Sequence, residues 1–304
     1  MAEASNFLTT ERVAVVTGAN KGIGLEICRQ LALKGIVVIL TARDEKKGDE
    51  AIDMLKECGL SNNVIFHQLD VTDTSTIAKL KDFIKARFGK LDILVNNAGV
   101  LGVLMDKDVI ISPEQDLFFE KLKVATQTCD LAEECIKTNY YGAKWMIQEL
   151  LPLLQLSDSP RIVNVSSMAG QLKNVRNEWA IGVLNDSENL TEDKVDEVWN
   201  AFLKDFKEGL LENKNWPPNS SAYILSKAAI NAYTRILAKK HPNFLINCVC
   251  PGYVKTDICL NCGTLSVEEG AESPVRLALL PQGGPSGNFF NRKELTFLMK
   301  LGIS

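Results

Sequence analysis

Short runs of valine, isoleucine and leucine recur along this 304-residue chain, and the segments between them follow the helical period. The run RVAVVT at 12–17, for example, is followed by an amphipathic stretch that continues to Leu33. Strand-length runs with little polar alternation indicate strands buried on both faces, which is typical of a parallel sheet with crossover helices. We therefore expect an α/β fold with a doubly wound sheet. The expected strands are 12–17, 36–41, 64–69, 93–95, 162–165 and 245–249.

Two stretches, 103–128 and 171–220, interrupt this alternation. The second is long for a connection, so we expect it to carry helices of its own and a function. No internal repeat or low-complexity linker marks a boundary. The sequence therefore predicts a single domain over 1–304 that contains both stretches.

Charge and cysteine usage exclude several classes of protein. A formal net charge of −4 argues against a nucleic-acid surface, which needs a basic stripe. The N-terminal residues have no signal-peptide pattern and no apolar run is long enough to cross a bilayer, so we expect a soluble, cytoplasmic protein. The eight cysteines are scattered, which favours reduced thiols. Cys259 and Cys262 have the spacing of a redox or zinc pair, but with only two histidines in the chain we expect no metal site.

The strongest chemical motif is the glycine-rich segment TGANKGIG at 17–24, which follows a strand and opens a helix. Glycines let the backbone turn tightly beside a pyrophosphate, and the helix N-terminus offers unpaired N–H groups. A glycine trio alone could be a simple turn, but in this setting it indicates a dinucleotide site in a Rossmann-type domain. The loop residues expected to bind the cofactor are Gly18, Asn20, Lys21, Gly22, Ile23 and Gly24.

The charges after the second expected strand bear on the choice between NAD and NADP. Asp44 stands about twenty residues beyond the glycine loop, a spacing that by itself indicates NAD. Because the strand ends near residue 41 or 42, however, Arg43 is expected to face the 2′ position of the adenosine ribose. Its guanidinium and the ammonium of Lys21 would pair with a 2′-phosphate, so we predict NADPH and NADP+ as cofactors. Alternatively, both cations are solvated surface charges, which predicts equal affinity for NADH and NADPH.

Tyr223 and Lys227 are four residues apart in SAYILSK, at the start of a segment with helical character. Side chains at this spacing share one face of a helix. A phenol has an ordinary pKa of about 10 and needs a neighbouring cation to favour its ionised form. The pair is therefore either ordinary helix packing or a proton donor beside its tuning cation.

A series of short motifs along the chain resembles, in kind and in order, the motifs of the short-chain dehydrogenase/reductase family. The shared segments are the glycine loop, LDV at 69–71, NNAG at 96–99, Asn139, Ser166-Ser167, Tyr223-xxx-Lys227 and Pro251-Gly252. The resemblance runs from about residue 12 to 287, and it includes phrases such as LALLPQGGPSGNFF that are similar to the plant menthone/neomenthol reductase and salutaridine reductase subgroup.

The resemblance implies four catalytic roles. Tyr223 would be the general acid, and Lys227 would lower its pKa and bind the nicotinamide ribose. Ser167 would hold the substrate oxygen; its neighbour Ser166 is the rival, and the family pattern favours the second serine. Asn139 would perturb its helix and hold a water that links Lys227 to solvent, unless it is a helix-interior amide that packs against a neighbour.

The resemblance also extends the cofactor site. The further residues it assigns there are Asp70, Val71, Asn97, Pro251, Val254 and Thr256. The first two would border the adenine, and the last two would contact the nicotinamide carboxamide. Asn97 would support the glycine loop against the cofactor or would be purely a structural brace.

The distance between Ser167 and Tyr223 is longer than in compact family members because 171–220 is inserted between them. In the resembled subgroup a similar insertion packs over the helical face that other members use for oligomer contacts, which implies a monomer. Together with 103–128 it would form a lid that excludes water from the substrate. The apolar candidates for this lid are Phe118, Phe119, Trp179 and Trp199, although each could be plain core.

The function implied by the resemblance is NADPH-dependent reduction of a small-molecule ketone, of alicyclic monoterpenoid or alkaloid type, to a secondary alcohol. One alternative is broad reduction of reactive aldehydes and ketones. Another is reduction of an enone C=C bond, as in a relative of the same subgroup that lacks the catalytic tyrosine. A non-catalytic NADP-binding protein is disfavoured because all four catalytic residues are present.

Overall fold

The computed structural model of this protein describes residues 12–105 and 117–296, which contain an eight-stranded sheet in the order β3-β2-β1-β4-β5-β6-β7-β8. Strands β1 to β7 pair in parallel, and β8 is antiparallel to β7. The strands are β1 (Val13–Val16), β2 (Val37–Ala42), β3 (Val64–Gln68), β4 (Ile93–Asn96), β5 (Arg161–Val165), β6 (Leu245–Cys250), β7 (Phe289–Asn291) and β8 (Glu294–Leu295). The predicted doubly wound α/β fold is confirmed.

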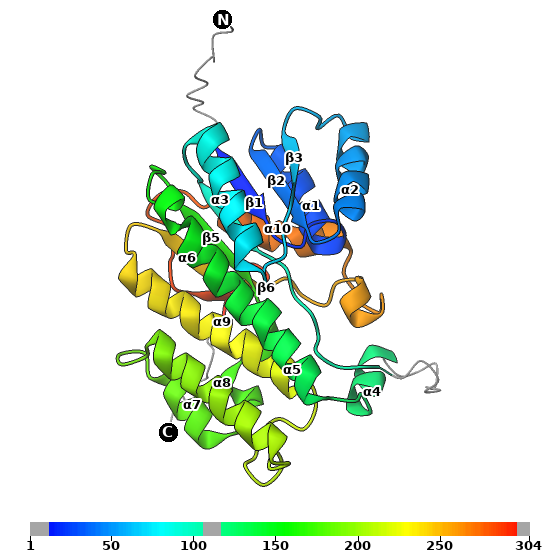
Figure 1. Cartoon of the computed structure of the whole chain (residues 1–304), viewed down its shortest axis with the longest axis vertical. Helices are drawn as coiled ribbons and strands as arrows, with labels where there is room; N and C mark the ends of the chain where they lie inside the picture. Colours follow the sequence, from blue (N-terminus) through cyan, green and yellow to red (C-terminus); the bar gives the residue numbers. More distant parts are fainter. Residues whose placement is uncertain (1–11, 106–116, 297–304) are drawn as a thin grey trace, which may run out of the picture.

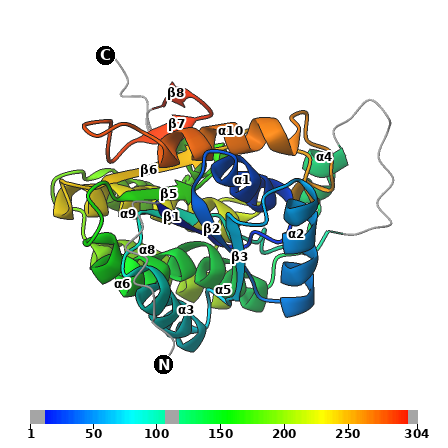
Figure 2. The same ribbon diagram turned by 90° about the horizontal axis from the view of Figure 1, so that it is seen from above.

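Both faces of the sheet are covered, as its apolar strands require. In β1, Val13 and Val15 belong to one hydrophobic core, whereas Ala14 and Val16 belong to a second core on the opposite face. Figure 2 shows the sheet between these two helical layers. One layer is formed by α1 (Gly22–Ala32), α2 (Glu45–Glu57) and α10 (Val267–Ala278), and the other by α3 (Thr74–Phe88), α5 (Cys129–Ile136), α6 (Gly142–Leu154) and α9 (Ser221–Lys240).

The sequence prediction missed the last two strands. β7 has three residues and β8 has two, and both follow the turn-rich segment QGGPSG. Such short segments carry too little periodicity to be recognised alone. They become strands because β7 pairs with β6 and places Phe289 opposite Cys248.

The inserted stretch forms helices, as predicted. Its two main helices are α7 (Glu178–Asn185) and α8 (Glu192–Lys207), which lie beside α9 in Figure 1. Trp199 is 4% exposed and packs against Phe202, so of the two roles considered for it, lid or plain core, the structure shows a core residue. Trp179 is 48% exposed and lies outside the cavity described below.

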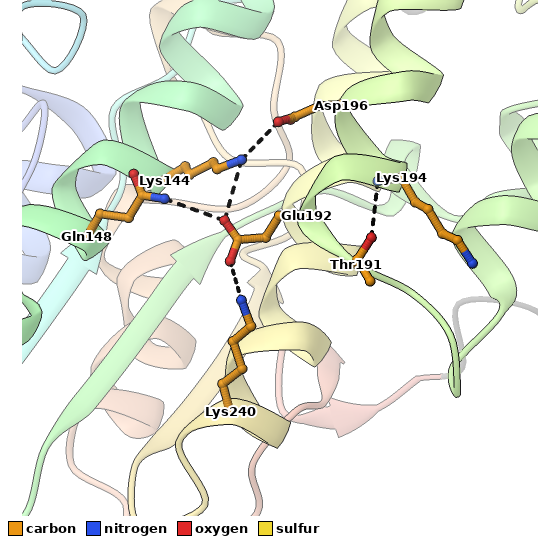
Figure 3. Close-up of polar contacts among 7 residues, drawn as sticks. All are labelled: Lys144, Gln148, Thr191, Glu192, Lys194, Asp196 and Lys240. Carbon is orange, nitrogen blue, oxygen red and sulfur yellow. Dashed lines mark hydrogen bonds and ion pairs between the residues drawn. The ribbon is translucent and has the colours of Figure 1, made fainter.

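Polar contacts fasten α8 to the main body of the domain, and those made by Glu192 and Asp196 are drawn in Figure 3. The ammonium Nζ of Lys144 on α6 lies 3.0 Å from Asp196 and 3.5 Å from Glu192. Glu192 also pairs with Lys240 at the end of α9, at 2.6 Å. The insertion is therefore docked across α6 and α9 and covers this part of the helical layer.

The first interrupting stretch, 103–128, is described in part. Residues 106–116 lie outside the described residues, and α4 (Leu117–Lys123) follows them. Leu104 and Thr126 form an antiparallel bridge with N–H···O distances of 3.0 and 2.9 Å. In the described part of the chain, every helix is too short or too polar to traverse a bilayer.

Candidate active site

A cavity of about 1620 Å³ opens at the carboxyl ends of the parallel strands. It extends across the point where β1 and β4 lead to opposite halves of the sheet, which is where open α/β sheets bind ligands. Every residue predicted for the site lines this cavity except Asn139, which lies behind its wall. The fold therefore brings together residues from Gly18 to Thr256.

The glycine loop forms one end of the cavity. Gly18 has φ +61°, and a Cβ there would lie 2.8 Å from the Cα of Ala98. A Cβ at Gly24 would lie 2.5 Å from the side-chain nitrogen of Asn97. Gly22 is the first residue of α1, whose free N–H groups face the loop. The cradle therefore needs glycine for its shape, and it suits a pyrophosphate.

Asn97 braces this loop. Its Nδ2 donates to the backbone oxygens of Thr17 at 2.9 Å and of Gly18 at 3.0 Å. Its own N–H donates to the hydroxyl of Thr17 at 2.9 Å. The geometry thus gives Asn97 a structural role between β1 and β4, and it also lines the cavity.

The adjacent side chains of Arg43 and Asp44 have different roles in the structure. The carboxylate of Asp44 accepts a hydrogen bond from the N–H of Lys47 at 3.0 Å and caps the N-terminus of α2. Arg43 follows β2 directly, is exposed and lines the cavity; in the described part of the chain it forms no ion pair. Lys21 pairs with Asp257 across the mouth of the cavity. Of the two cations predicted to bind a 2′-phosphate, Arg43 is therefore the one that forms no ion pair among the described residues.

Tyr223 and Lys227 lie on the first turns of α9, which carries them to the end of β5. The Nζ of Lys227 is 5.5 Å from the centre of the Tyr223 ring and donates to the carbonyl oxygen of Val165 at 2.9 Å. Burial raises the pKa of the Tyr223 phenol, while a hydrogen bond with Ser167 acts to lower it. Burial also lowers the pKa of Lys227 to about 8. The phenol therefore holds its proton at neutral pH.

The hydroxyls of the two neighbouring serines have different hydrogen-bond partners. The Ser166 hydroxyl donates to Asn231 of α9 at 2.6 Å, and the residue is 3% exposed. The Ser167 hydroxyl accepts a hydrogen bond from the N–H of Ala169 at 3.1 Å and interacts with Tyr223. Both serines line the cavity, but the Ser166 hydroxyl is used in the packing between β5 and α9, whereas the Ser167 hydroxyl interacts with the phenol.

Asn139 lies in a five-residue π-helical segment, Lys137–Tyr141, between α5 and α6. Its side chain forms two hydrogen bonds with the backbone of Val100: Nδ2 donates to the carbonyl oxygen at 2.9 Å, and Oδ1 accepts from the N–H at 2.8 Å. Nδ2 also donates to Ser226 of α9 at 3.0 Å. The perturbed helix is as expected. The contacts of Asn139 also connect the loop after β4 to α9, the helix that contains Tyr223.

The loop after β6 closes the far end of the cavity. Val254 is 3% exposed, and a Cβ on Gly263 or Gly270 would lie 2.2 or 2.6 Å from its atoms. This tight packing holds Pro251, Val254 and Thr256 along the cavity wall. Asp70 and Val71 line the opposite part, after β3.

Sequence reasoning missed one residue, Tyr253, of an aromatic wall of the cavity. Tyr253 lies between Pro251-Gly252 and Val254, and its ring centre is 6.0 Å from Phe118 and 5.3 Å from Phe119. The two phenylalanines were predicted to face the substrate, and both line the cavity. The position of Tyr253 after the carboxyl end of a strand was the available signal.

Known proteins share both the sequence and the fold of this chain. The sequence profile described as short chain dehydrogenase matches residues 12–178. The (+)-neomenthol dehydrogenase of Arabidopsis thaliana is 59% identical over 290 residues, which cover 94% of this chain and 98% of that protein. The solved structure of salutaridine reductase from Papaver somniferum has a TM-score of 0.87 and 54% identity, and covers 92% of this chain and 99% of its own. Carbonyl reductase (NADPH) 1 of Mus musculus is 40% identical over 294 residues, 93% of this chain and 97% of that protein.

Proposed function

Because this chain belongs to the short-chain dehydrogenase/reductase family, we propose that it reduces a ketone to a secondary alcohol with NADPH. The observation that carries the proposal is the convergence of Tyr223, Ser167 and Lys227 on one wall of a cavity that begins at the glycine loop. The relatives named neomenthol dehydrogenase and salutaridine reductase support the same reaction class.

NADP(H) suits the cofactor end of the cavity. The glycine cradle leaves room for a pyrophosphate, and Arg43 is an open cation where the 2′ position of the ribose is expected. The carboxylate that would select NAD is committed to the N-cap of α2. The printed name of the mouse relative includes NADPH, which agrees with this choice.

The glycine loop and Arg43 would hold NADPH, which would supply a hydride for the carbonyl carbon. Tyr223 donates its phenolic proton to the carbonyl oxygen, and this proton and the hydride together complete the alcohol. Ser167 donates a hydrogen bond to the same oxygen as negative charge develops there. Lys227, when protonated, stabilises the phenolate that remains on Tyr223. The raised pKa of the phenol favours this direction because the proton is present at neutral pH.

The substrate end of the cavity suits an apolar ketone. Its lining here is predominantly hydrophobic and includes the aromatic wall of Phe118, Phe119 and Tyr253. The further apolar lining residues are Leu101, Val103, Met105, Leu122, Met168 and Ile224. We infer an alicyclic ketone of monoterpenoid or alkaloid type. The competing C=C reductase is disfavoured because Tyr223 is present to protonate an oxygen.

A substrate panel tests the proposal. NADPH oxidation would be followed with menthone-like cyclic ketones, aromatic aldehydes and cyclic enones, and each product would be identified as an alcohol or a saturated ketone. Turnover of cyclic ketones to alcohols supports the proposal. Saturated ketones as sole products would instead establish a C=C reductase, and tight NADPH binding without turnover would establish a non-catalytic protein.

The same proposal includes a monomer that works in the cytoplasm. The docking of α8 across α6 and α9 occupies the helical face that would otherwise be open to a second copy. The eight cysteines are all free thiols, which fits a reducing compartment. Light scattering of the purified protein tests the first point, and the location of a fluorescent fusion tests the second.

A further inference from the structure

Gln127 joins two parts of the chain that are far apart in the sequence. It lies at the end of the stretch 103–128, immediately before the N-cap of α5. Its Nε2 donates to the carbonyl oxygen of Pro218 at 3.0 Å. Its Oε1 accepts hydrogen bonds from the N–H and from the hydroxyl of Ser221, both at 2.7 Å. Both polar atoms of its side chain are therefore bonded to the segment that leads into α9.

The N-terminus of α9 has no cap of its own. Ser220 occupies the N-cap position with a left-handed φ of +49°, and its side chain caps no helical N–H. Its hydroxyl is buried and has no hydrogen-bond partner among the described residues. Ser221 is fully buried, so its N–H requires an internal partner. Gln127 provides that partner across 94 residues and takes over the role of a cap.

The helical turn fixed in this way carries Tyr223. The tyrosine follows Ser221 by two residues, and Pro218 and Ser220 line the cavity just before it. Gln127 is itself held in place, because the adjacent Thr126 is bonded to Leu104 in both directions. Movement of this glutamine would therefore shift the first turn of α9 relative to Ser167, which lies two residues after the end of β5.

We propose that Gln127 is a positioning residue, which holds the first turn of α9 so that the Tyr223 hydroxyl meets the substrate oxygen bound by Ser167. This role rests on the proposed function, because it takes Tyr223 as the proton donor. Gln127 does not line the cavity, so it acts through its contacts with Ser221 and Pro218. A misplacement of reacting groups by about 1 Å can lower a rate roughly a hundredfold.

Three variants test this role. Gln127→Ala removes all three hydrogen bonds, whereas Gln127→Glu keeps the acceptor oxygens for Ser221 and loses only the donor to Pro218. A carboxylate is also favourable at a helix N-terminus. Gln155→Ala is the matched control, because Gln155 is exposed at the C-cap of α6 and outside the cavity.

The measurements are kcat and KM for a ketone that the parent reduces, Kd for NADPH by fluorescence, and the pH profile of alcohol oxidation. We expect Gln127→Ala to lower kcat about tenfold to a hundredfold, with NADPH affinity unchanged. Its alcohol oxidation should begin at higher pH, because a displaced Tyr223 loses the pKa-lowering hydrogen bond with Ser167. Gln127→Glu should keep the parent kcat but raise KM for the ketone, since the wall at Pro218 is released.

Parent kcat and parent pH profile in Gln127→Ala would overturn the role. So would a Gln127→Glu variant that binds NADPH normally but is as slow as Gln127→Ala. If the alanine variant does not fold, the kcat of the glutamate variant decides the question alone. A parent protein that reduces no carbonyl at all would refute the proposed function itself, and this role with it, before any variant is compared.

Discussion

The Nζ atom of Lys227 lies 5.5 Å from the centre of the Tyr223 ring, and burial affects the two side chains in opposite directions. It raises the pKa of the phenol, so that the proton stays on the donor. It lowers the pKa of the lysine to about 8, so that its charge is lost within an accessible pH range. Proton donor and charge stabiliser therefore coexist only below that pH.

A pH profile of ketone reduction should reveal this pair. Lys227 is charged below its pKa of about 8 and neutral above it. Because the charge stabilises the developing phenolate, kcat/KM should be level near pH 7 and fall as the pH rises through about 8. The measurement is kcat/KM for the ketone from pH 6 to pH 10. A rate that stays level to the alkaline end would contradict the assignment of this charge.

Tyr223→Phe should abolish most turnover while the cofactor still binds. The variant keeps the ring and removes only the acidic proton, and general acid catalysis contributes about 10²–10⁴-fold to a rate. We expect a loss of kcat in that range with an unchanged Kd for NADPH. Reduction at the parent rate would show that another group donates the proton.

Arg43→Ala should weaken NADPH selectively. A hydrogen-bonded ion pair with a phosphate is worth about 1.5–3 kcal/mol, so KM for NADPH should rise about tenfold to a hundredfold while KM for NADH changes little. Asp44→Ala is the matched neighbour: it removes the N-cap of α2 and should cost about 1 kcal/mol of unfolding free energy without changing the NADPH preference. A change of preference in Asp44→Ala and not in Arg43→Ala would reverse the assignment.

Lys144→Met should loosen the insertion. Its ammonium contacts Asp196 and Glu192, and the side chain is 11% exposed, so the substitution leaves partly buried carboxylates without that partner. We expect the free energy of unfolding in urea to fall by about 1–3 kcal/mol. Lys194 on α8 points away from this network (Figure 3), so Lys194→Met should stay within about 0.5 kcal/mol of the parent. Equal effects of both variants would argue against the docking role.

Local sequence patterns predicted the features that depend on residues close together in the sequence. The glycine loop follows its strand and opens α1, and the spacing of Tyr223 and Lys227 places them together on α9. The apolar runs predicted six of the strands, because a strand buried on both faces has a composition that is visible within a few residues. β7 was missed since its three residues become a strand only through pairing with β6.

The sequence by itself determined the fold class, the dinucleotide loop and the tyrosine–lysine pair, because each is encoded within one turn or one strand. Only the tertiary structure decided which of two neighbouring side chains is already bonded to another part of the fold. Asp44 is used as a helix cap beside the open Arg43, and Ser166 is bonded to Asn231 beside the available Ser167. It also decided that Gln127 caps α9 from 94 residues away. These outcomes depend on contacts between distant segments, and hydrogen bonds of that kind leave no periodic trace in the chain.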